Sequence, residues 1–222
     1  MRILIINEVC GTGSTGKICA DIAREYEKKG YEAKIAYGRK KYIPAECKKY
    51  GIRIGNAIDV YAHVAKTLIL DQHGFGSIRA TKQFLKWVDD FNPDVIWLHN
   101  LHGYYINIEL LFKWIKNHKV EVKWTLHDCW AFTGHCTHFL IADCNKWQTQ
   151  CGNCPQKTRY PASRLLDNSY NNFQRKKEAF QGVSNLELIT PSQWLADLTR
   201  LSFLSNYPVT VKYNEINTEI FK

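Results

Sequence analysis

The chain has 222 residues and a formal net charge of +9, and 45% of its residues are hydrophobic and 23% charged. This composition excludes a disordered or collagen-like chain, and the length allows a sizeable core in one large domain or two small ones. The positive charge indicates an anionic partner, such as nucleic acid, a nucleotide phosphate or a membrane surface, unless it serves only solubility.

The predicted strands and helices alternate along the chain. Continuous apolar runs predict buried strands, and apolar residues spaced by three and four predict helices. We expect strands at 2–7, 32–37, 95–98, 120–126, 186–190 and 209–211, and helices from about 16 to 30 and at 56–70, 78–91, 107–117, 169–181 and after Ser192. This rhythm predicts an α/β fold with a doubly wound, Rossmann-like parallel sheet.

Three of the predicted helices carry informative apolar positions. Ser192 is expected to cap the last helix. In 56–70 a stripe comprises Ile58, Tyr61, Ala62, Ala65, Leu68 and Ile69. In 78–91 the buried side comprises Thr81, Phe84, Val88 and Phe91. After Ser192 the inward residues are Trp194, Leu195 and Leu198.

Polar clusters follow four of the predicted strands, at 7–16, 99–104, 127–135 and 190–192. Ligands of doubly wound sheets bind outside the carboxyl ends of the strands. The four clusters therefore predict one shared site at that edge.

The first cluster contains a Gly-rich loop that nearly matches a phosphate-binding P-loop, Gly11-x4-Gly16-Lys17. Ile18 occupies the position where such loops need Ser or Thr to bind magnesium, and Asp128 is the only candidate for the strand-end Asp. The pattern disfavours a nucleotide hydrolase. Two interpretations remain open: a loop that approaches a phosphate or sugar without magnesium, and a tight turn that needs positive φ.

Residues 134–156 form an irregular, cysteine-rich insertion. Four thiolates can complete a structural zinc site, in which His135 or His138 could replace one ligand, and two disulfides are the alternative. The other cysteines are expected to be free core thiols. The four candidate ligands are Cys136, Cys144, Cys151 and Cys154.

Three histidines, His99, His102 and His127, are expected at strand ends on the same edge of the sheet. Together they could bind a metal, sugar hydroxyls or phosphate. His127 precedes Asp128, but adjacent residues on a strand point to opposite faces, so we do not expect them to act as a pair.

Several motifs recur in the order of one enzyme family. They are the runs 13–18 (Gly-Ser-Thr-Gly-Lys-Ile), 93–103 (Pro-Asp-Val-Ile-Trp-Leu-His-Asn-Leu-His-Gly) and 124–136 (Trp-Thr-Leu-His-Asp-Cys-Trp-Ala-Phe-Thr-Gly-His-Cys). Through them nearly the whole chain resembles the colanic-acid and capsular polysaccharide branch of the retaining glycosyltransferases with the GT-B fold. Ile18 after the lysine is typical of that family, which argues against magnesium.

The resemblance implies two Rossmann-like domains with different binding functions. The N-terminal domain binds the acceptor and the C-terminal domain holds the nucleotide-sugar donor. This chain resembles the acceptor-side domain, over 1–208, and 209–222 resembles the start of the interdomain linker, with Glu215 and Asn217 departing from the usual Asn-Gly-Ile-Asp. We therefore expect a hexosyltransferase-type enzyme that is inactive without its donor domain and whose acceptor is a polysaccharide or lipid-linked saccharide.

The resemblance also implies site residues. His127 would be catalytic, beside the transferring sugar, and the Gly-rich loop would approach the donor diphosphate or the acceptor. No catalytic base is named, because retention in this family needs no obvious protein nucleophile. The implied substrate-binding residues are Gly13, Ser14, Thr15, Gly16, Asn100 and His102.

The N-terminal apolar run, 3–6, is too short for a signal peptide, which predicts a cytoplasmic protein. A basic helix with Arg175, Lys176 and Lys177 indicates either peripheral association with the inner face of the cell membrane, or a lipid-diphosphate acceptor, or an ordinary solvated helix face. A zinc-stabilised nucleic-acid-binding module is the alternative function that the charge and the cysteines favour. The resemblance makes a nucleic-acid partner unexpected.

Overall fold

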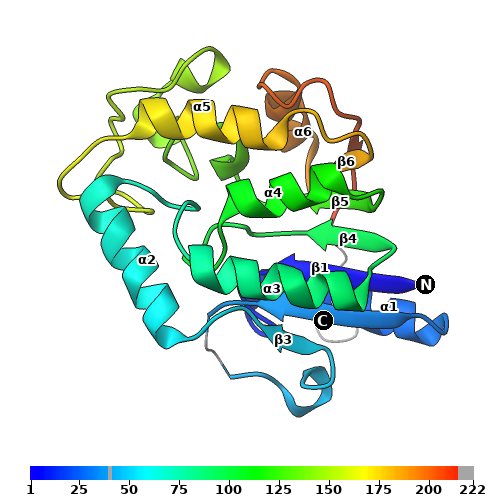
Figure 1. The fold of residues 1–222 in the computed structure, drawn as a ribbon. Helices are drawn as coiled ribbons and strands as arrows, with labels where there is room; N and C mark the ends of the chain where they lie inside the picture. Colours follow the sequence, from blue (N-terminus) through cyan, green and yellow to red (C-terminus); the bar gives the residue numbers. More distant parts are fainter. Residues whose placement is uncertain (40–41, 215–222) are drawn as a thin grey trace, which may run out of the picture.

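The structure is a computed structural model that describes residues 1–39 and 42–214. Its centre is one seven-stranded sheet in which every strand pair is parallel, in the order β3-β2-β1-β4-β5-β6-β7 (Figure 1). The strands are β1 (Arg2–Asn7), β2 (Glu32–Tyr37), β3 (Gly51–Arg53), β4 (Val95–Leu98), β5 (Glu121–Thr125), β6 (Leu186–Thr190) and β7 (Val209–Val211). The predicted Rossmann-like sheet is confirmed, because β1 lies centrally and the chain winds outward from it in both directions.

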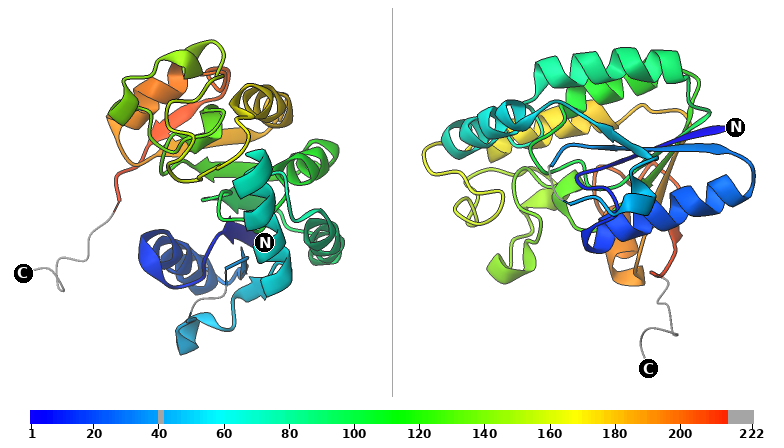
Figure 2. Two further views of the ribbon diagram at one scale, coloured as in Figure 1. Left: turned by 90° about the vertical axis from the view of Figure 1, so that its left-hand side faces the viewer. Right: turned by 90° about the horizontal axis from the view of Figure 1, so that it is seen from below.

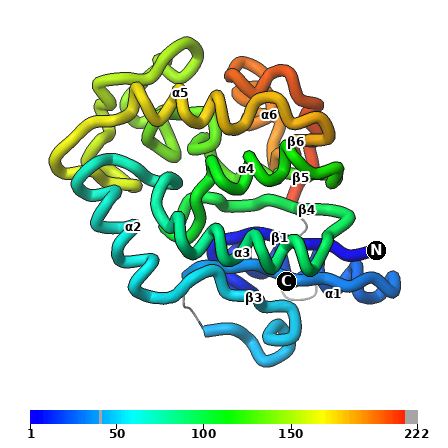
Figure 3. The backbone as a smooth tube through the Cα atoms, viewed as in Figure 1, coloured from blue at the N-terminus to red at the C-terminus, as the bar shows by residue number. Residues whose placement is uncertain are grey.

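Helices cover both faces of the sheet (Figure 2). One face carries α1 (Gly13–Lys28) and α6 (Gln193–Arg200). The other carries α3 (Ile78–Phe91), α4 (Ile108–Asn117) and α5 (Ser169–Phe180). The tube in Figure 3 shows α2 (Ala57–Leu70) standing apart at the side of the molecule. In the described part of the chain no helix is long and apolar enough to cross a membrane.

The core consists of two layers, one on each side of the sheet. Side chains alternate along a strand, so Ile3 and Ile5 of β1 join the layer under α1, whereas Leu4 and Ile6 join the layer under α3 and α4. The predicted buried side of α3 is confirmed, since all four expected residues are buried. This core holds the strand ends that carry the candidate site in fixed positions.

The structure departs from the sequence-based elements in three places. β3 was not expected, and α1 begins at Gly13 rather than near Gly16. Trp194 was expected to point inward but is 45% exposed, whereas Ser192 Oγ does accept the N–H of Leu195 as the predicted cap. Val209–Val211 completes the sheet as its last strand. Glu215 and Asn217 lie outside the described residues.

The insertion between β5 and α5 is irregular apart from three short 3₁₀ turns, at Trp130–Phe132, Leu140–Ala142 and Lys146–Gln148. It is nevertheless anchored by aromatic packing. Trp147 stacks on Phe139, with ring centroids 4.7 Å apart, and both belong to the main core. The buried aromatic rings stabilise this segment by removing apolar surface from water.

Candidate functional site

The loops after β1 and β4 are joined by one buried side chain, that of Asn7. Its amide nitrogen donates to Val9 O at 2.8 Å and to Thr15 Oγ1 at 3.3 Å, and its amide oxygen accepts the N–H of Asn100 at 3.3 Å. Asn7 is fully buried at the end of β1. The Gly-rich loop and the 99–104 loop are therefore held together at the carboxyl edge of the sheet.

The four residues expected in the Gly-rich loop divide into two pairs. Gly13 and Ser14 are exposed at the start of α1, and nothing lies within 4 Å of a Cβ built on Gly13. Thr15 and Gly16 are buried, and a Cβ on Gly16 would lie 3.1 Å from Val9 Cγ2. Thus Gly13 and Ser14 are accessible to a ligand, whereas Thr15 and Gly16 shape the turn. Positive φ at Gly13, +67°, fits the tight-turn interpretation as well.

His127 lies at the end of β5, where it stacks on His99. Their rings are 5.3 Å apart, and His99 Nδ1 is 3.0 Å from His127 Nε2. His127 is half-buried, and burial lowers its pKa to about 4 although Asp128 raises it. The imidazole is therefore neutral near pH 7, so it can exchange hydrogen bonds with a sugar or phosphate without carrying a charge.

Asp128 pairs with His102 rather than with its neighbour His127. His102 Nε2 lies 2.8 Å from Asp128 Oδ2, and Trp130 N–H donates to Asp128 Oδ1 at 2.8 Å. Burial raises the pKa of Asp128, but His102 and the Trp130 N–H outweigh it and hold that pKa below its usual value. The carboxylate is ionised near pH 7 and accepts the Nε2–H of His102.

The remaining ring nitrogen of His102 faces the insertion. His102 Nδ1 is 3.2 Å from the hydroxyl of Tyr160. Burial raises the pKa of Tyr160, so the hydroxyl keeps its proton and can donate to Nδ1 in the tautomer that carries its hydrogen on Nε2. Hydrogen bonds thus connect Asp128 through His102 to Tyr160. Tyr160 is 42% exposed, so this series of hydrogen bonds ends at the surface. Such a series can orient sugar hydroxyls at the surface.

Aromatic rings pack around the hydrogen-bonded side chains of His102 and Tyr160. His73 is buried, accepts the N–H of Gly103 at its Nε2, and lies 4.5 Å from the ring of Tyr104 and 5.7 Å from that of Tyr160. Trp130 packs against both His73 and His102. These aromatic side chains keep His102 and Tyr160 in place and offer ring surface on which a sugar could stack.

The structure brings most of the residues predicted at the carboxyl edge together and adds three that were not named as site residues, of which Asn7 and Asp128 belong to the predicted polar clusters. His99, Asn100, His102 and His127 all follow β4 or β5 at the carboxyl edge, as predicted. The added residues are Asn7, Asp128 and Tyr160. β5 ends at Thr125, so the strand alternation that separated His127 from Asp128 does not apply. Tyr160 is 58 positions from His102, and no local pattern signals that contact.

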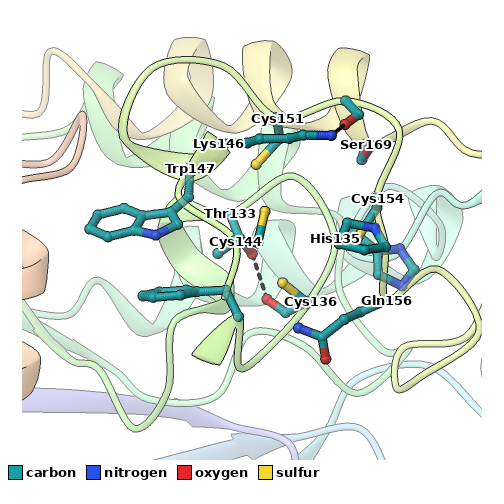
Figure 4. Close-up of a pocket in the computed structure, with 13 residues that line it drawn as sticks. Thr133, His135, Cys136, Cys144, Lys146, Trp147, Cys151, Cys154, Gln156 and Ser169 are labelled. Atoms are coloured by element: carbon teal, nitrogen blue, oxygen red, sulfur yellow. Dashed lines mark hydrogen bonds between the residues drawn. The ribbon is translucent and has the colours of Figure 1, made fainter. Parts of the chain in front are cut away.

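The four cysteines of the insertion line one pocket with His135 and Trp147 (Figure 4). All eight cysteines of the chain have free thiols, so the disulfide alternative is not supported. The thiol of Cys154 hydrogen bonds with that of Cys136, which raises the pKa of Cys154, and the N–H of Gly134 donates to Cys151 Sγ at 3.2 Å. Burial also raises the pKa of Cys151, to about 11. The thiols of Cys151 and Cys154 are therefore protonated near pH 7.

The predicted structural zinc is not supported. The cysteines share a pocket, but over residues 1–39 and 42–214 no group of three or more Cys, His, Asp or Glu side chains is arranged so that it could hold one metal ion. Both ring nitrogens of His135 have protein partners, since Nδ1 lies 2.5 Å from Asp71 Oδ1 and Nε2 lies 3.4 Å from Arg159 O. The aromatic packing of Trp147 and Phe139 gives the insertion a means of folding without metal.

The expected basic helix face is wrong for two of its three cations. Lys176 is buried, and its ammonium donates to Trp130 O at 2.7 Å and to Thr133 O at 3.0 Å. Arg175 forms a bidentate pair with Glu109. These side chains fasten α5 to the insertion and to α4, so they offer neither a membrane surface nor a solvated face.

No family model matches the chain. A search of curated proteins finds similarity to an Escherichia coli (strain K12) protein named "Putative colanic acid biosynthesis glycosyl transferase WcaC". The two are 26% identical over 208 residues, which is 89% of this chain and 50% of the relative. The chain thus spans about half the length of the curated relative that it matches. The similarity supports a glycosyltransferase and agrees in that respect with the resemblance seen in the motifs.

Proposed function

We propose that this chain is the acceptor-side domain of a glycosyltransferase of polysaccharide biosynthesis. The observation that carries the proposal is the similarity to the colanic acid glycosyl transferase along most of the chain. The proposed enzyme has the GT-B form, retains configuration and is of the hexosyltransferase type. It transfers a sugar from a nucleotide-sugar donor to a polysaccharide or lipid-linked saccharide.

The rim at the carboxyl ends of β1, β4 and β5 would be the acceptor site. His102, oriented by Asp128 at 2.8 Å, and Tyr160 would exchange hydrogen bonds with acceptor hydroxyls, and Asn100 would line the same pocket. Tyr104 and Tyr160, with ring centroids 6.2 Å apart, would supply apolar ring surface. Sugar sites commonly combine a few placed polar groups with aromatic surface.

His127 would lie beside the transferring sugar. Its Nε2 is engaged by His99 at 3.0 Å, which fixes the ring and directs Nδ1 elsewhere. A neutral imidazole held in this way can position a sugar hydroxyl or a phosphate oxygen, which is the role of a catalytic hydrogen-bonding group. Gly13 and Ser14, exposed at the start of α1, would approach the donor diphosphate through backbone N–H groups.

The donor would be held mainly by a second domain, so residues 1–208 alone would bind acceptor and transfer no sugar. Residues 209–222 would lead toward that domain. The proposed location is the cytoplasm, and a lipid-linked acceptor would bring the protein to the inner face of the membrane as a peripheral protein. Structural zinc is not part of the proposal, and no step depends on a metal.

Saccharide binding by the 222-residue chain tests the proposal. Saturation-transfer NMR with a panel of oligosaccharides should detect binding that His102→Ala and Tyr160→Phe each weaken by about tenfold, the value of one or two good hydrogen bonds. His118→Ala is the matched control, since His118 is an exposed histidine that directly follows α4 and contacts Trp114 and Asp89. Absence of saccharide binding, with steeply salt-dependent oligonucleotide binding in its place, would refute the proposal.

A further inference from the structure

The exposed face of α2 is apolar and its buried face is polar. Ile58, Tyr61 and Ile69 are 77%, 73% and 47% exposed, whereas the buried residues of the helix are His63 and Thr67. A helix that packs on a protein core shows the opposite pattern. The apolar face of α2 is therefore directed at something other than its own core.

The apolar positions form one continuous stripe. Residues 58, 61, 62, 65 and 69 are spaced by three and four, so they lie on one side of the helix, and all are exposed. None of them is charged. The one acidic residue of α2, Asp59, lies at the helix start, where its carboxylate accepts the N–H of Asn56 at 2.9 Å.

A second exposed apolar segment lies beside the end of α2 (Figure 1). The N–H of Arg164 donates to Leu68 O at 2.8 Å, and that of Leu166 donates to Ile69 O at 3.2 Å. Leu165 and Leu166 are 66% and 53% exposed. Together, the α2 face comprises Ile58, Tyr61, Ala62, Ala65, Ile69, Leu165 and Leu166.

The segment next to the α2 face carries three cations, and one exposed acid, Asp167, follows it and accepts the N–H groups of Cys154 and Ser169. Residues 156–166 contain Lys157, Arg159 and Arg164 and no Asp or Glu. The two acids at this border, Asp59 and Asp167, both accept backbone N–H groups, whereas Arg159 and Arg164 are exposed. Apolar side chains bordered by exposed cations match the surface of an anionic bilayer, in which phosphates lie above hydrocarbon.

We propose that the α2 face docks on an anionic lipid surface, with α2 lying along the membrane and Leu165 and Leu166 entering the boundary between headgroups and acyl chains. The inference rests on the proposed membrane association and assigns it to named residues. Tyr160 belongs to the same basic segment and contacts His102 at 3.2 Å. Docking in this way would hold the candidate acceptor site beside the headgroup layer, where the saccharide of a lipid-linked acceptor begins.

Vesicle sedimentation with the 222-residue chain tests the α2 face. The probes are vesicles of phosphatidylglycerol mixed with phosphatidylcholine and vesicles of phosphatidylcholine alone. The wild type should bind the anionic vesicles. Ile58→Asp and Leu165→Asp should each weaken binding by about tenfold or more, because each replaces an aliphatic side chain that the membrane would bury by a carboxylate. Leu201→Asp is the matched control, since Leu201 is 61% exposed but follows α6 on the other face of the sheet, and it should bind like the wild type.

Three results would overturn the proposal: no binding of the wild type to anionic vesicles, an equal loss in Leu201→Asp, or a dimer of the wild type in sedimentation velocity that Ile58→Asp disrupts. The last would assign the face to a second copy of the chain. The readout involves no sugar, so a failure here removes the membrane face while saccharide binding at the rim is decided by its own experiment.

Discussion

Replacing His63 by alanine removes the acceptor on which the loop after α2 depends. His63 Nε2 accepts the N–H groups of Gly74 and Gly76, each at 3.1 Å, and its Nδ1 is 2.9 Å from Ser77 Oγ. Gly74 and Gly76 are buried, and a Cβ on Gly76 would lie 2.4 Å from the His63 ring. A side chain at position 76 would therefore collide with the imidazole, so the loop packs directly on His63.

The expected cost follows from the two N–H groups. A buried donor left without a partner costs about 1–3 kcal/mol, so the His63→Ala variant should lose about 2–6 kcal/mol of unfolding free energy. Urea unfolding followed by tryptophan fluorescence would measure this as a lower midpoint with an unchanged slope. The control is His118→Ala, an exposed histidine, which should change stability by no more than about 0.5 kcal/mol.

The pH dependence gives a second, independent readout. Burial lowers the pKa of His63 to about 4, whereas the unfolded chain takes up this proton near 6.5. Between these values the unfolded state binds more protons, so wild-type stability falls as the pH falls, by about 1.4 kcal/mol per pH unit from this residue. The His63→Ala variant lacks that contribution. A stability difference between the two proteins that stays constant from pH 6.5 down to pH 5 would refute the argument.

Three further predictions concern the thiols, Lys176 and His127. Unfolded without reductant, the protein should yield eight reactive thiols per chain with a disulfide reagent. The native protein should yield fewer, because Cys19 and Cys129 are buried. Fewer than eight reactive thiols after unfolding would establish disulfides. Burial lowers the pKa of Lys176 to about 7, whereas a lysine of the unfolded chain still holds its proton between pH 7 and 9. The unfolding free energy of the wild type should therefore rise over this range relative to that of Lys176→Met. Parallel pH profiles of the two proteins would contradict this. In a complete two-domain enzyme, His127→Ala should lower turnover by about 10²–10⁴-fold with little change in Tm, and a large fall in Tm with unchanged turnover would make His127 a structural residue.

The sheet could be predicted from sequence because its strands are strong, continuous apolar runs. Ile3 to Ile6 and Val95 to Leu98 are buried on both faces, and short continuous apolar runs of this kind are typical of strands in a parallel sheet. Gly51–Arg53 could not be found, because three half-buried residues give no pattern. Trp194 was misplaced because its position in a short amphipathic helix is at the margin of the apolar face.

The candidate site was predictable only as a location. The carboxyl-edge rule placed His102 and His127, but not the partners that orient them. Asp128 was set aside because β5 was expected to continue through Leu126, and Tyr160 reaches His102 from an irregular insertion. Likewise, Lys176 looked like a surface cation until its contacts with Trp130 O and Thr133 O were known. Contacts between distant segments leave no trace in local periodicity.

Both borders of the sheet are formed by its shortest strands, Gly51–Arg53 and Val209–Val211, of three residues each. A border strand offers unpaired N–H and C=O groups on which a strand from another molecule can be added, and that risk grows with its length. Of the long strands, β1 is enclosed by β2 and β4, and β2 is covered by β1 along its length and by β3 over residues 35–37. The protein should therefore resist edge-to-edge aggregation at high concentration, and any self-association should proceed through side chains rather than through added backbone pairing.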